Sequence, residues 1–434
     1  EGPMRLQFLY RRRWLLMYLP ILAGLVLGCA WAALVWKPLP PQRLVMATGP
    51  AGSSYLRVAQ SYAARLERLG VQVEIITHPR PQDALDRLAR PADIVDVALA
   101  QGLYSQQGLP VQGLAAVGHE IVWVFARHSV QSIAQLRGLR IAAAASGSSN
   151  HRAAEMLLAH ARIKPTEVQF EPLVGDAAIT ALAEDRVDVV VHVATGDSST
   201  AAALARMDGV RLVTVERAGA LAAREPRLRP LVIPQGSIEL RSDIPAADVA
   251  AMATLTHLLV RPGLHPALQR TLLDVAHEVH STGGFLEGQG QYPSVRGGDF
   301  ALSPVAQQYA LGIRPWLETL LPYRAAQWAE LVLYALVPLS ALALVLLRRV
   351  PVFIEWRVNA ALQHFYGELK FLEADMVKIA TGDPIALRWV VTRLDKLEQQ
   401  VAAMDLPDRF ADRWYTLREH LSSARERLLK LRAR

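Results

Sequence analysis

Two glycine-containing turns hold the residues with the clearest chemistry. Each turn follows a strand-like run and precedes a helix-like run, in "LVMATGPAGSSY" (44–55) and "RIAAAASGSSN" (140–150). A helix start leaves its first N–H groups without intrahelical partners and has the positive end of the helix dipole. Glycine lets a ligand approach that backbone, and serine adds a hydroxyl donor. The turns therefore predict two sites that prefer an anionic group, above all a carboxylate or a phosphate.

Polar residues at the ends of the predicted strands extend both sites, because ligands of open α/β sheets bind at the carboxyl ends of strands. The candidate ligand-binding residues of the first half are Thr48, Gly49, Gly52, Ser53, Ser54, Tyr55, Thr77, His78 and Gln101. Those of the second half are Ser146, Gly147, Ser148, Ser149, Asn150, Thr195, Gly196 and Asp197. His78 and Arg80 would offer positive charge to a carboxylate. The alternative is that Ser53 and Ser148 only cap their helices.

The elements around the two turns are repeated. Strand, glycine turn, helix, strand, helix and strand follow one another in residues 44–102 and again in residues 139–196. This alternation predicts an α/β fold with largely parallel sheets. Two similar lobes that face each other across a cleft explain the repeat, and a chance likeness of two ordinary strand–helix turns is the alternative.

Two apolar runs bound the α/β segment. Residues 14–36 contain no charge, and residues 328–347 contain only Glu330. About 20 apolar residues are enough to span a bilayer as a helix. Arginines precede the first run at 11–13 and follow the second at 348–349, which predicts cytoplasmic termini. The net charge agrees, since +5 in residues 1–43 and +4 in residues 348–434 leave −2 for residues 44–347 of the total of +7.

The predicted organisation therefore has five parts. They are a cytoplasmic N-terminus (1–13), a transmembrane helix (14–36), a two-lobed extracytoplasmic domain (44–323), a second transmembrane helix (328–347) and a cytoplasmic helical hairpin or bundle (351–434). This organisation predicts a two-pass protein of the bacterial inner membrane with its binding domain in the periplasm. The single cysteine, Cys29, excludes an intrachain disulfide. Lipid modification of Cys29 is the alternative to an uncleaved anchor.

The C-terminal segment has apolar residues at alternating spacings of three and four, which predict packed helical seams. The seam residues are Leu387, Val390, Leu394, Leu397, Val401 and Met404, followed by Leu417, Leu421, Ala424, Leu428 and Leu431. Pro407 separates the two series. Packing of these helices on each other is one interpretation, and docking of a cytoplasmic protein on residues 351–434 is the other.

Enzymatic chemistry finds little support in the sequence. "TGDSST" (195–200), with Asp274 and His277, has the residue types of a serine hydrolase, but no G-x-S-x-G motif is present. "HEVH" (277–280) lacks the spacing that places two metal ligands on one helix face. We predict no enzyme, no cofactor and no metal site. Because the basic charge belongs to the membrane flanks, we also predict no nucleic-acid partner.

Four segments in order, 48–55, 92–101, 132–150 and 176–193, resemble the TAXI family of solute-binding proteins from TRAP transporters. The likeness covers roughly residues 44–235 and extends more weakly to 323. It implies a two-lobed, type II periplasmic-binding-protein-like domain that closes on a small organic acid or amino acid. It also implies delivery to a TRAP-type permease. The sequence after Thr77, the two membrane helices and the C-terminal helices depart from the family pattern.

We therefore expect a membrane-anchored protein that captures a small carboxylate-bearing solute for a TRAP-type transporter or another inner-membrane partner. The alternative is a transmembrane receptor or scaffold that senses a periplasmic ligand and signals through its cytoplasmic helices. An envelope assembly factor with a degenerate cleft is a third hypothesis.

Overall fold

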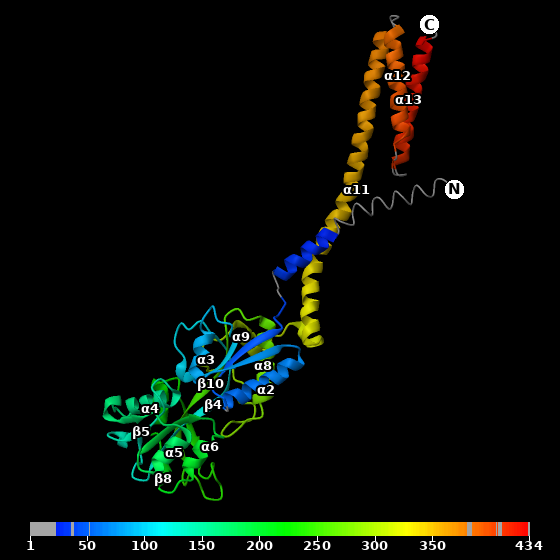
Figure 1. The fold of residues 1–434 in the computed structure, drawn as a ribbon. Coiled ribbons are helices and arrows are strands. Elements are labelled where there is room, and N and C mark those ends of the chain that lie inside the picture. The colour runs from blue at the N-terminus through cyan, green and yellow to red at the C-terminus, as the bar shows by residue number, and fades with distance from the viewer. Residues whose placement is uncertain are drawn as a thin grey trace. The chain divides into compact units, whose positions relative to one another are not determined.

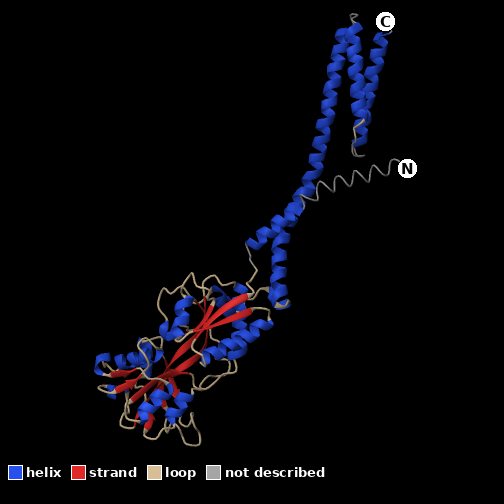
Figure 2. Cartoon of the chain, in the orientation of Figure 1, coloured by secondary structure: helices blue, strands red, loops and turns tan. Residues whose placement is uncertain are grey.

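The computed structural model describes residues 23–35, 39–51, 53–379, 384–404, 406 and 410–432. The chain divides into two compact units (Figures 1 and 2). One unit comprises residues 37–331, and the other comprises residues 332–434 together with the N-terminal segment.

The first unit is built on one ten-stranded sheet. Eight strands follow one another in space in the order β2 (Gln72–Thr77), β1 (Arg43–Thr48), β3 (Val97–Gln101), β10 (Val249–Val260), β4 (Gln112–Arg127), β7 (Val189–Ala194), β5 (Arg140–Ala142) and β6 (Gln169–Glu171). In addition, β8 (Val210–Leu212) pairs with β4, and β9 (Arg229–Ile233) pairs with β10.

The predicted repeat is present in this sheet. The first lobe has the order β1, α2 (Ser54–Arg68), β2, α3 (Pro81–Leu88) and β3, and the second has β5, α4 (Ser149–His160), β6, α5 (Gly175–Ala183) and β7. In each lobe the first strand lies between the other two and is parallel to both. The α/β prediction and the two-lobe interpretation of the repeat are confirmed. The expectation of largely parallel sheets is wrong, because β4 and β10 pair antiparallel with each other and with the strands beside them.

In each lobe, an aspartate carboxylate accepts a hydrogen bond from a backbone amide near the start of the central strand. Asp96, just before β3, accepts a hydrogen bond from the Val45 amide at 2.9 Å, and Asp188, just before β7, accepts one from the Arg140 amide at 2.9 Å. Each aspartate also pairs with an arginine, Asp96 with Arg261 at 2.7 Å and Asp188 with Arg140 at 2.8 Å. These aspartates are the acidic residues that precede the last strand of each sequence repeat, and they fix the start of the central strand.

Two long antiparallel strands join the lobes. Residues 256–260 of β10 pair with β3 of the first lobe, while residues 121–126 of β4 pair with β7 of the second lobe. The two strands pair with each other from Met252 with Val122 to Val260 with Gln112. The lobes therefore share β4 and β10 as their common connection, which is the arrangement of a hinge.

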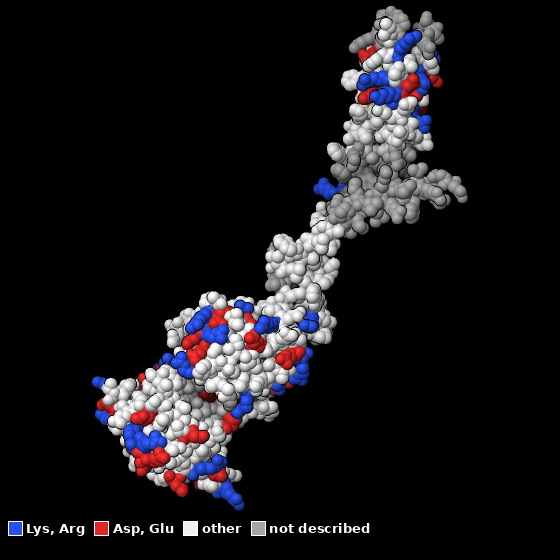
Figure 3. Space-filling model, viewed as in Figure 1, with Lys and Arg blue, Asp and Glu red and all other residues white. Residues whose placement is uncertain are grey.

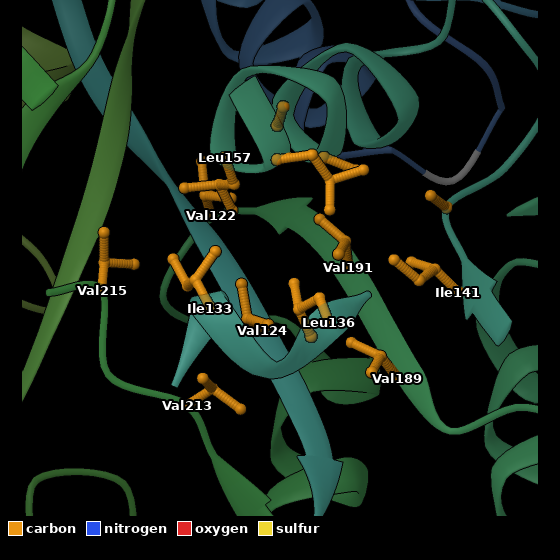
Figure 4. Packing of buried hydrophobic residues seen from close by; sticks show 14 of the residues in the cluster. Val122, Val124, Ile133, Leu136, Ile141, Leu157, Val189, Val191, Val213 and Val215 are labelled. Carbon is orange, nitrogen blue, oxygen red and sulfur yellow. The ribbon is translucent and has the colours of Figure 1, made fainter. Parts of the chain in front are cut away.

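Apolar side chains cover both faces of the sheet in each lobe. In the second lobe, alternate residues of β4 and β7, such as Val122, Val124, Val189 and Val191, pack against Leu157 of α4 (Figure 4). On the opposite face, Trp123 and Phe125 stack with ring centroids 6.0 Å apart. This period of two places successive β4 residues in different cores.

Five further helices complete the unit: α6 (Ser199–Ala205), α7 (Ala218–Arg224), α8 (Pro266–His280), α9 (Pro304–Ala310) and α10 (Trp316–Leu320). The 3₁₀ turns are η1 (Gly102–Tyr104), η2 (Ile133–Leu136) and η3 (Pro165–Glu167). Helix α8 packs between α2 and α9 and buries Leu268, Leu272 and Ala276.

The second unit is helical. It contains most of α11 (Tyr323–Ile379), together with α12 (Pro384–Ala402) and α13 (Ala411–Arg432). Its core includes the predicted seam residues Val390, Leu394, Leu397, Val401, Leu417, Leu421, Ala424 and Leu428, all buried. The break between the two seams is present, since α12 ends at 402 and α13 begins at 411. The interpretation that these helices pack on each other is confirmed.

The expectation of two membrane-spanning helices is met by one candidate in the described residues. Tyr323–Val345 is long and apolar enough to cross a bilayer, and Figure 3 shows this part of α11 with very few charged side chains. The first predicted span, 14–36, is described only over the shorter apolar helix Ala23–Val35, and its other residues lie outside the described part of the chain. Helix α11 also continues through 351, where the sequence predicted a new domain, and runs without a break to Ile379.

Replacement of Asp188 tests the repeated carboxylate contact. Hydrogen bonds from Arg140 lower the pKa of Asp188, so its stabilising effect is present above the ordinary aspartate pKa of 3.8 and is lost as the pH falls through the lower pKa of the folded state. We expect Asp188→Asn to reduce the free energy of unfolding by about 1–3 kcal/mol at pH 7, and less below pH 4. Urea unfolding of the full chain measures this, with the exposed Asp208→Asn as control. A variant as stable as the wild type at pH 7 would contradict the assignment.

Candidate functional site

Both glycine turns begin helices, as the sequence predicts. Ser53 is the N-cap of α2 and accepts a hydrogen bond from the Leu56 amide at 3.3 Å. Ser148 is the N-cap of α4, where it accepts from the His151 amide at 3.2 Å and donates to the Ala143 carbonyl at 3.3 Å. Capping therefore occupies both serine hydroxyls in this conformation. Gly52 lies outside the described residues.

The second turn contacts the first lobe through Tyr104, which lies in η1 just after β3. The Tyr104 hydroxyl donates to the Gly147 carbonyl at 3.4 Å. From α4, the guanidinium of Arg152 lies 4.9 Å from the centre of the Tyr104 ring and donates to the Leu103 carbonyl at 2.9 Å. Burial raises the pKa of the Tyr104 hydroxyl to about 12, so this group stays a neutral donor. The start of α4 thus lies against the carboxyl end of β3.

An ion pair connects the lobes at a second point. Arg57, in the first turn of α2, lies 3.3 Å from Asp197, which follows β7. Asp197 also accepts a hydrogen bond from the Thr195 hydroxyl at 2.5 Å. Both members of the ion pair are largely exposed, so the pair contributes little to stability. It places the loop after β7 beside the start of α2.

Glu120 lies where the two lobes meet and is the centre of a buried polar cluster. It is on β4, only 3% exposed, directly opposite Thr254 of β10. One carboxylate oxygen accepts hydrogen bonds from the hydroxyls of Tyr55 and, at 3.2 Å, Thr256, while the other accepts from the side-chain amide of Gln101. These contacts join the start of α2, the end of β3 and both hinge strands.

The strand register explains why these side chains meet. The order β3, β10, β4 puts Gln101 and Glu120 on either side of β10, with Thr256 paired to Gln101 and Thr254 paired to Glu120. Paired and alternate residues share one face of a sheet, so all four side chains lie on the same face. His119, the residue before Glu120 on β4, lies on the other face of the sheet, where it contacts Glu287 and Tyr292.

The electrostatics of the cluster do not match the predicted anion site. Burial raises the pKa of Glu120, and hydrogen bonds from Tyr55, Gln101 and Thr256 oppose that shift only in part. Tyr55 and Gln101, which the sequence predicted as ligand contacts, already donate to a carboxylate of the protein itself. A carboxylate of a solute beside Glu120 would meet like charge.

The sequence reasoning missed Glu120, Tyr104, Thr256 and Arg152. A signal for Glu120 existed, because it is the only acidic residue in the long apolar run "LAAVGHEIVWVFA" (114–126). A lone acidic residue inside a buried strand is costly unless it has partners. Nothing in the local sequence indicated those partners, which lie 65, 19 and 136 residues away.

Other predicted site residues have structural contacts or lie apart from the cluster. Asn150 accepts a hydrogen bond from the Val193 amide at 2.9 Å and so ties α4 to β7. Gly196 lies tightly against the Phe285 ring. Thr77 is exposed at the end of β2, and Arg80 pairs with Asp83 at 2.7 Å.

The remaining predicted residues lie at the two turns or close to them. Thr48 is fully buried, and its hydroxyl has no hydrogen-bond partner. Gly49 is buried, Ser54 and Ser149 are half-buried, and Ser146 is exposed. Burial and Arg87 lower the pKa of His78, which makes it a poor source of positive charge at neutral pH. The described residues contain no group of three potential metal ligands.

The comparison with family models does not agree with the expected family. A family model described as NMT1/THI5 like matches residues 66–223. The expected membership of the TAXI family is therefore wrong. The motifs that resembled that family are a glycine turn before a helix and a strand that ends in polar residues, and these features belong to the α/β topology of each lobe. A comparison with curated proteins finds no match.

Solved structures with a similar fold are distant in sequence. The periplasmic aliphatic sulphonate binding protein SsuA from Escherichia coli is 16% identical, covers 56% of this chain and 74% of its own length, and has a TM-score of 0.38. The alkanesulfonate-binding protein SsuA from Xanthomonas axonopodis pv. citri, bound to MOPS, is 17% identical, with 64% and 85% covered and a TM-score of 0.34. A periplasmic substrate-binding protein of an ABC transporter from Coxiella burnetii is 15% identical, with 62% and 96% covered and a TM-score of 0.31.

Together, the strand order and the family match give the first unit the α/β fold of type II periplasmic binding proteins. The family match also bears out the prediction of a solute-binding protein that is not an enzyme.

Removal of one donor tests the Glu120 cluster. Tyr55→Phe deletes the hydroxyl that donates to the buried carboxylate, so we expect the free energy of unfolding to fall by about 1–3 kcal/mol. Tyr309→Phe is the matched control, because the Tyr309 hydroxyl donates to the exposed carboxylate of Asp274 at 2.8 Å. Urea unfolding of the full chain compares the two variants. Equal, small effects would show that Glu120 does not depend on Tyr55.

Proposed function

We propose that the chain is a membrane-anchored solute-binding protein whose lobes close around a small solute at the junction of β3, β4 and the starts of α2 and α4. The observation that supports this most strongly is the meeting of polar groups from both lobes at the strands that join them. Tyr55 and Gln101 of the first lobe reach Glu120 on the shared strand. Three residues after Gln101, Tyr104 reaches Gly147 of the second lobe.

The proposed solute contacts are a subset of the residues predicted from sequence, together with Glu120. The subset consists of Thr48, Gly49, Ser53, Ser54, Tyr55, Gln101, Gly147, Ser148 and Ser149. Opening of the lobes would separate Tyr104 from Gly147 and expose the helix starts, and closure on a solute would exclude water and strengthen each polar contact. A small polar solute fits this site best, because the groups on its floor are hydroxyls, an amide and a carboxylate.

We propose that this unit works at a membrane surface. It ends in α10 and the start of α11, where Leu311, Ile313, Trp316 and Leu320 are each more than half exposed just before the apolar helix Tyr323–Val345. Tryptophan and apolar residues at the end of a spanning helix fit the bilayer interface. Arginines follow the other end of this apolar segment, at 348–349. This charge places the binding unit in the periplasm and the helical unit in the cytoplasm under the proposal.

Delivery of the solute to an inner-membrane transporter is the use we propose for such a protein. One observation favours signalling as a second candidate. Helix α11 begins at Tyr323, at the end of the binding unit, and its last part shares a core with α12 and α13. In this second candidate, α11 transmits a change in the binding unit to α12 and α13.

Charge reversal at the lobe contact tests closure. Asp197→Arg replaces the weak attraction to Arg57 by repulsion, so we expect a small increase in the separation of the lobes. Spin labels at the exposed positions 90 and 224, in a Cys29→Ser background, report the distance between lobes by double electron–electron resonance. The mean distance should increase in this variant and stay unchanged in Asp208→Arg, which reverses an exposed charge elsewhere in the second lobe. Identical distributions in both variants would contradict a mobile hinge.

Labelling of single cysteines tests the membrane topology. In the Cys29→Ser background, Arg90→Cys lies in the binding unit and Ser423→Cys in the helical unit, and both positions are exposed. An impermeant maleimide should label position 90 in intact spheroplasts and position 423 only after lysis. Equal labelling of both positions before lysis would exclude a helix that crosses the membrane between them.

A further inference from the structure

We propose that the solute presents a positively charged nitrogen, an ammonium or an amidinium group, to the carboxylate of Glu120. This inference rests on the proposed function, since it names the chemical class of the solute that the two lobes enclose. It replaces the carboxylate-bearing solute that the glycine turns alone predict.

The first argument is the absence of a counter-charge. The described partners of Glu120 are the hydroxyls of Tyr55 and Thr256 and the side-chain amide of Gln101, all of them neutral donors. Within the described part of the chain, no lysine, arginine or histidine lies within 4.0 Å of this carboxylate. A buried carboxylate is costly without an opposite charge, and a cationic solute would supply it.

The second argument is the presence of free acceptors beside the carboxylate. The carbonyl oxygen of the Gln101 side chain is buried and has no hydrogen-bond partner, although the same side chain donates to Glu120. The hydroxyl of Thr254, opposite Glu120 on β10, is also buried without a partner. An ammonium group has three donors and no acceptor, so Glu120, Gln101 and Thr254 together match its hydrogen-bonding needs.

The third argument is against a solute that presents a negative charge to this site. Tyr55 and Gln101 are the donors that an anionic solute would need at the first turn, and both already donate to Glu120. From the second lobe, Arg152 stacks on Tyr104 and donates to the Leu103 carbonyl. An anion at this floor would therefore find occupied donors and a carboxylate. An amino acid would bind here through its amine.

Protonation of Glu120 should make the affinity for the solute depend on pH. Burial raises the pKa of Glu120, and the groups that face it, Tyr55, Gln101, Thr256 and Tyr104, do not ionise near neutral pH. A proton on Glu120 would compete with the cationic solute. Affinity for an amine should therefore fall as the pH is lowered, whereas affinity for an uncharged solute should not.

The experiment compares three probes of equal chain length on the full chain in detergent: 1,4-diaminobutane, 1,4-butanediol and succinate. We expect only the diamine to raise the melting temperature, and its affinity to weaken at least tenfold in Glu120→Gln. Glu287→Gln is the matched control, because Glu287 binds the neighbouring His119 amide at 3.0 Å on the opposite face of β4. This control should bind the diamine as the wild type does. In the wild type, diamine affinity should fall from pH 8 to pH 5.

A second measurement keeps the proposal testable if Glu120→Gln fails to fold or the diamine is too small. Small molecules released by denaturing the purified wild-type protein are identified by mass spectrometry, and a basic nitrogen in the released solute supports the proposal. Stabilisation by succinate or the diol but not by the diamine, or a released solute without a basic nitrogen, would overturn the charge assignment and leave solute binding intact. No stabilisation by any probe and no released molecule would overturn both proposals.

Discussion

One buried carboxylate sets the main constraint on this molecule. Glu120 lies on the strand that both lobes share, and its burial requires donors from α2, β3 and β10 at the same point. Two of those donors, Gln101 and Tyr55, are side chains at the carboxyl end of a strand and at the start of a helix, where α/β proteins bind ligands. The interaction that holds the hinge region together is therefore also the floor of the proposed binding site, and stability and solute chemistry cannot change independently there.

The two lobes solve the same folding problem in the same way. In each, an aspartate before the last strand binds an amide near the start of the central strand, and a serine caps the helix that follows the glycine turn. The lobes then differ at the junction. The first contributes Tyr55 and Gln101 to the carboxylate, while the second contributes the Gly147 carbonyl to Tyr104. A repeated scaffold thus presents different groups from its two lobes at the junction.

Sequence reasoning succeeded where the signal is local. The glycine turns, the repeated element order and the helical seams around Leu394 and Leu421 depend on spacings within a few residues, and the structure contains all of them. It failed where a contact between side chains depends on the order and register of the strands. Gln101 meets Glu120 only because β10 lies between their strands, and no local pattern encodes that order. The same locality explains the wrong family, because motifs common to a fold cannot distinguish the families that share it.

Infrared difference spectroscopy of the full chain tests the central claim most directly. The claim is that Glu120 is a buried carboxyl group without a counter-charge of its own. In a pH titration of the solute-free protein, the wild-type spectrum should contain a protonated carboxyl band above pH 4.5, the ordinary value for glutamate, that is missing from the spectrum of Glu120→Gln. Any band of Glu287 or Asp299, whose pKa values burial also raises, should remain in both spectra. A Glu120 band that disappears at or below pH 4.5 would contradict the account.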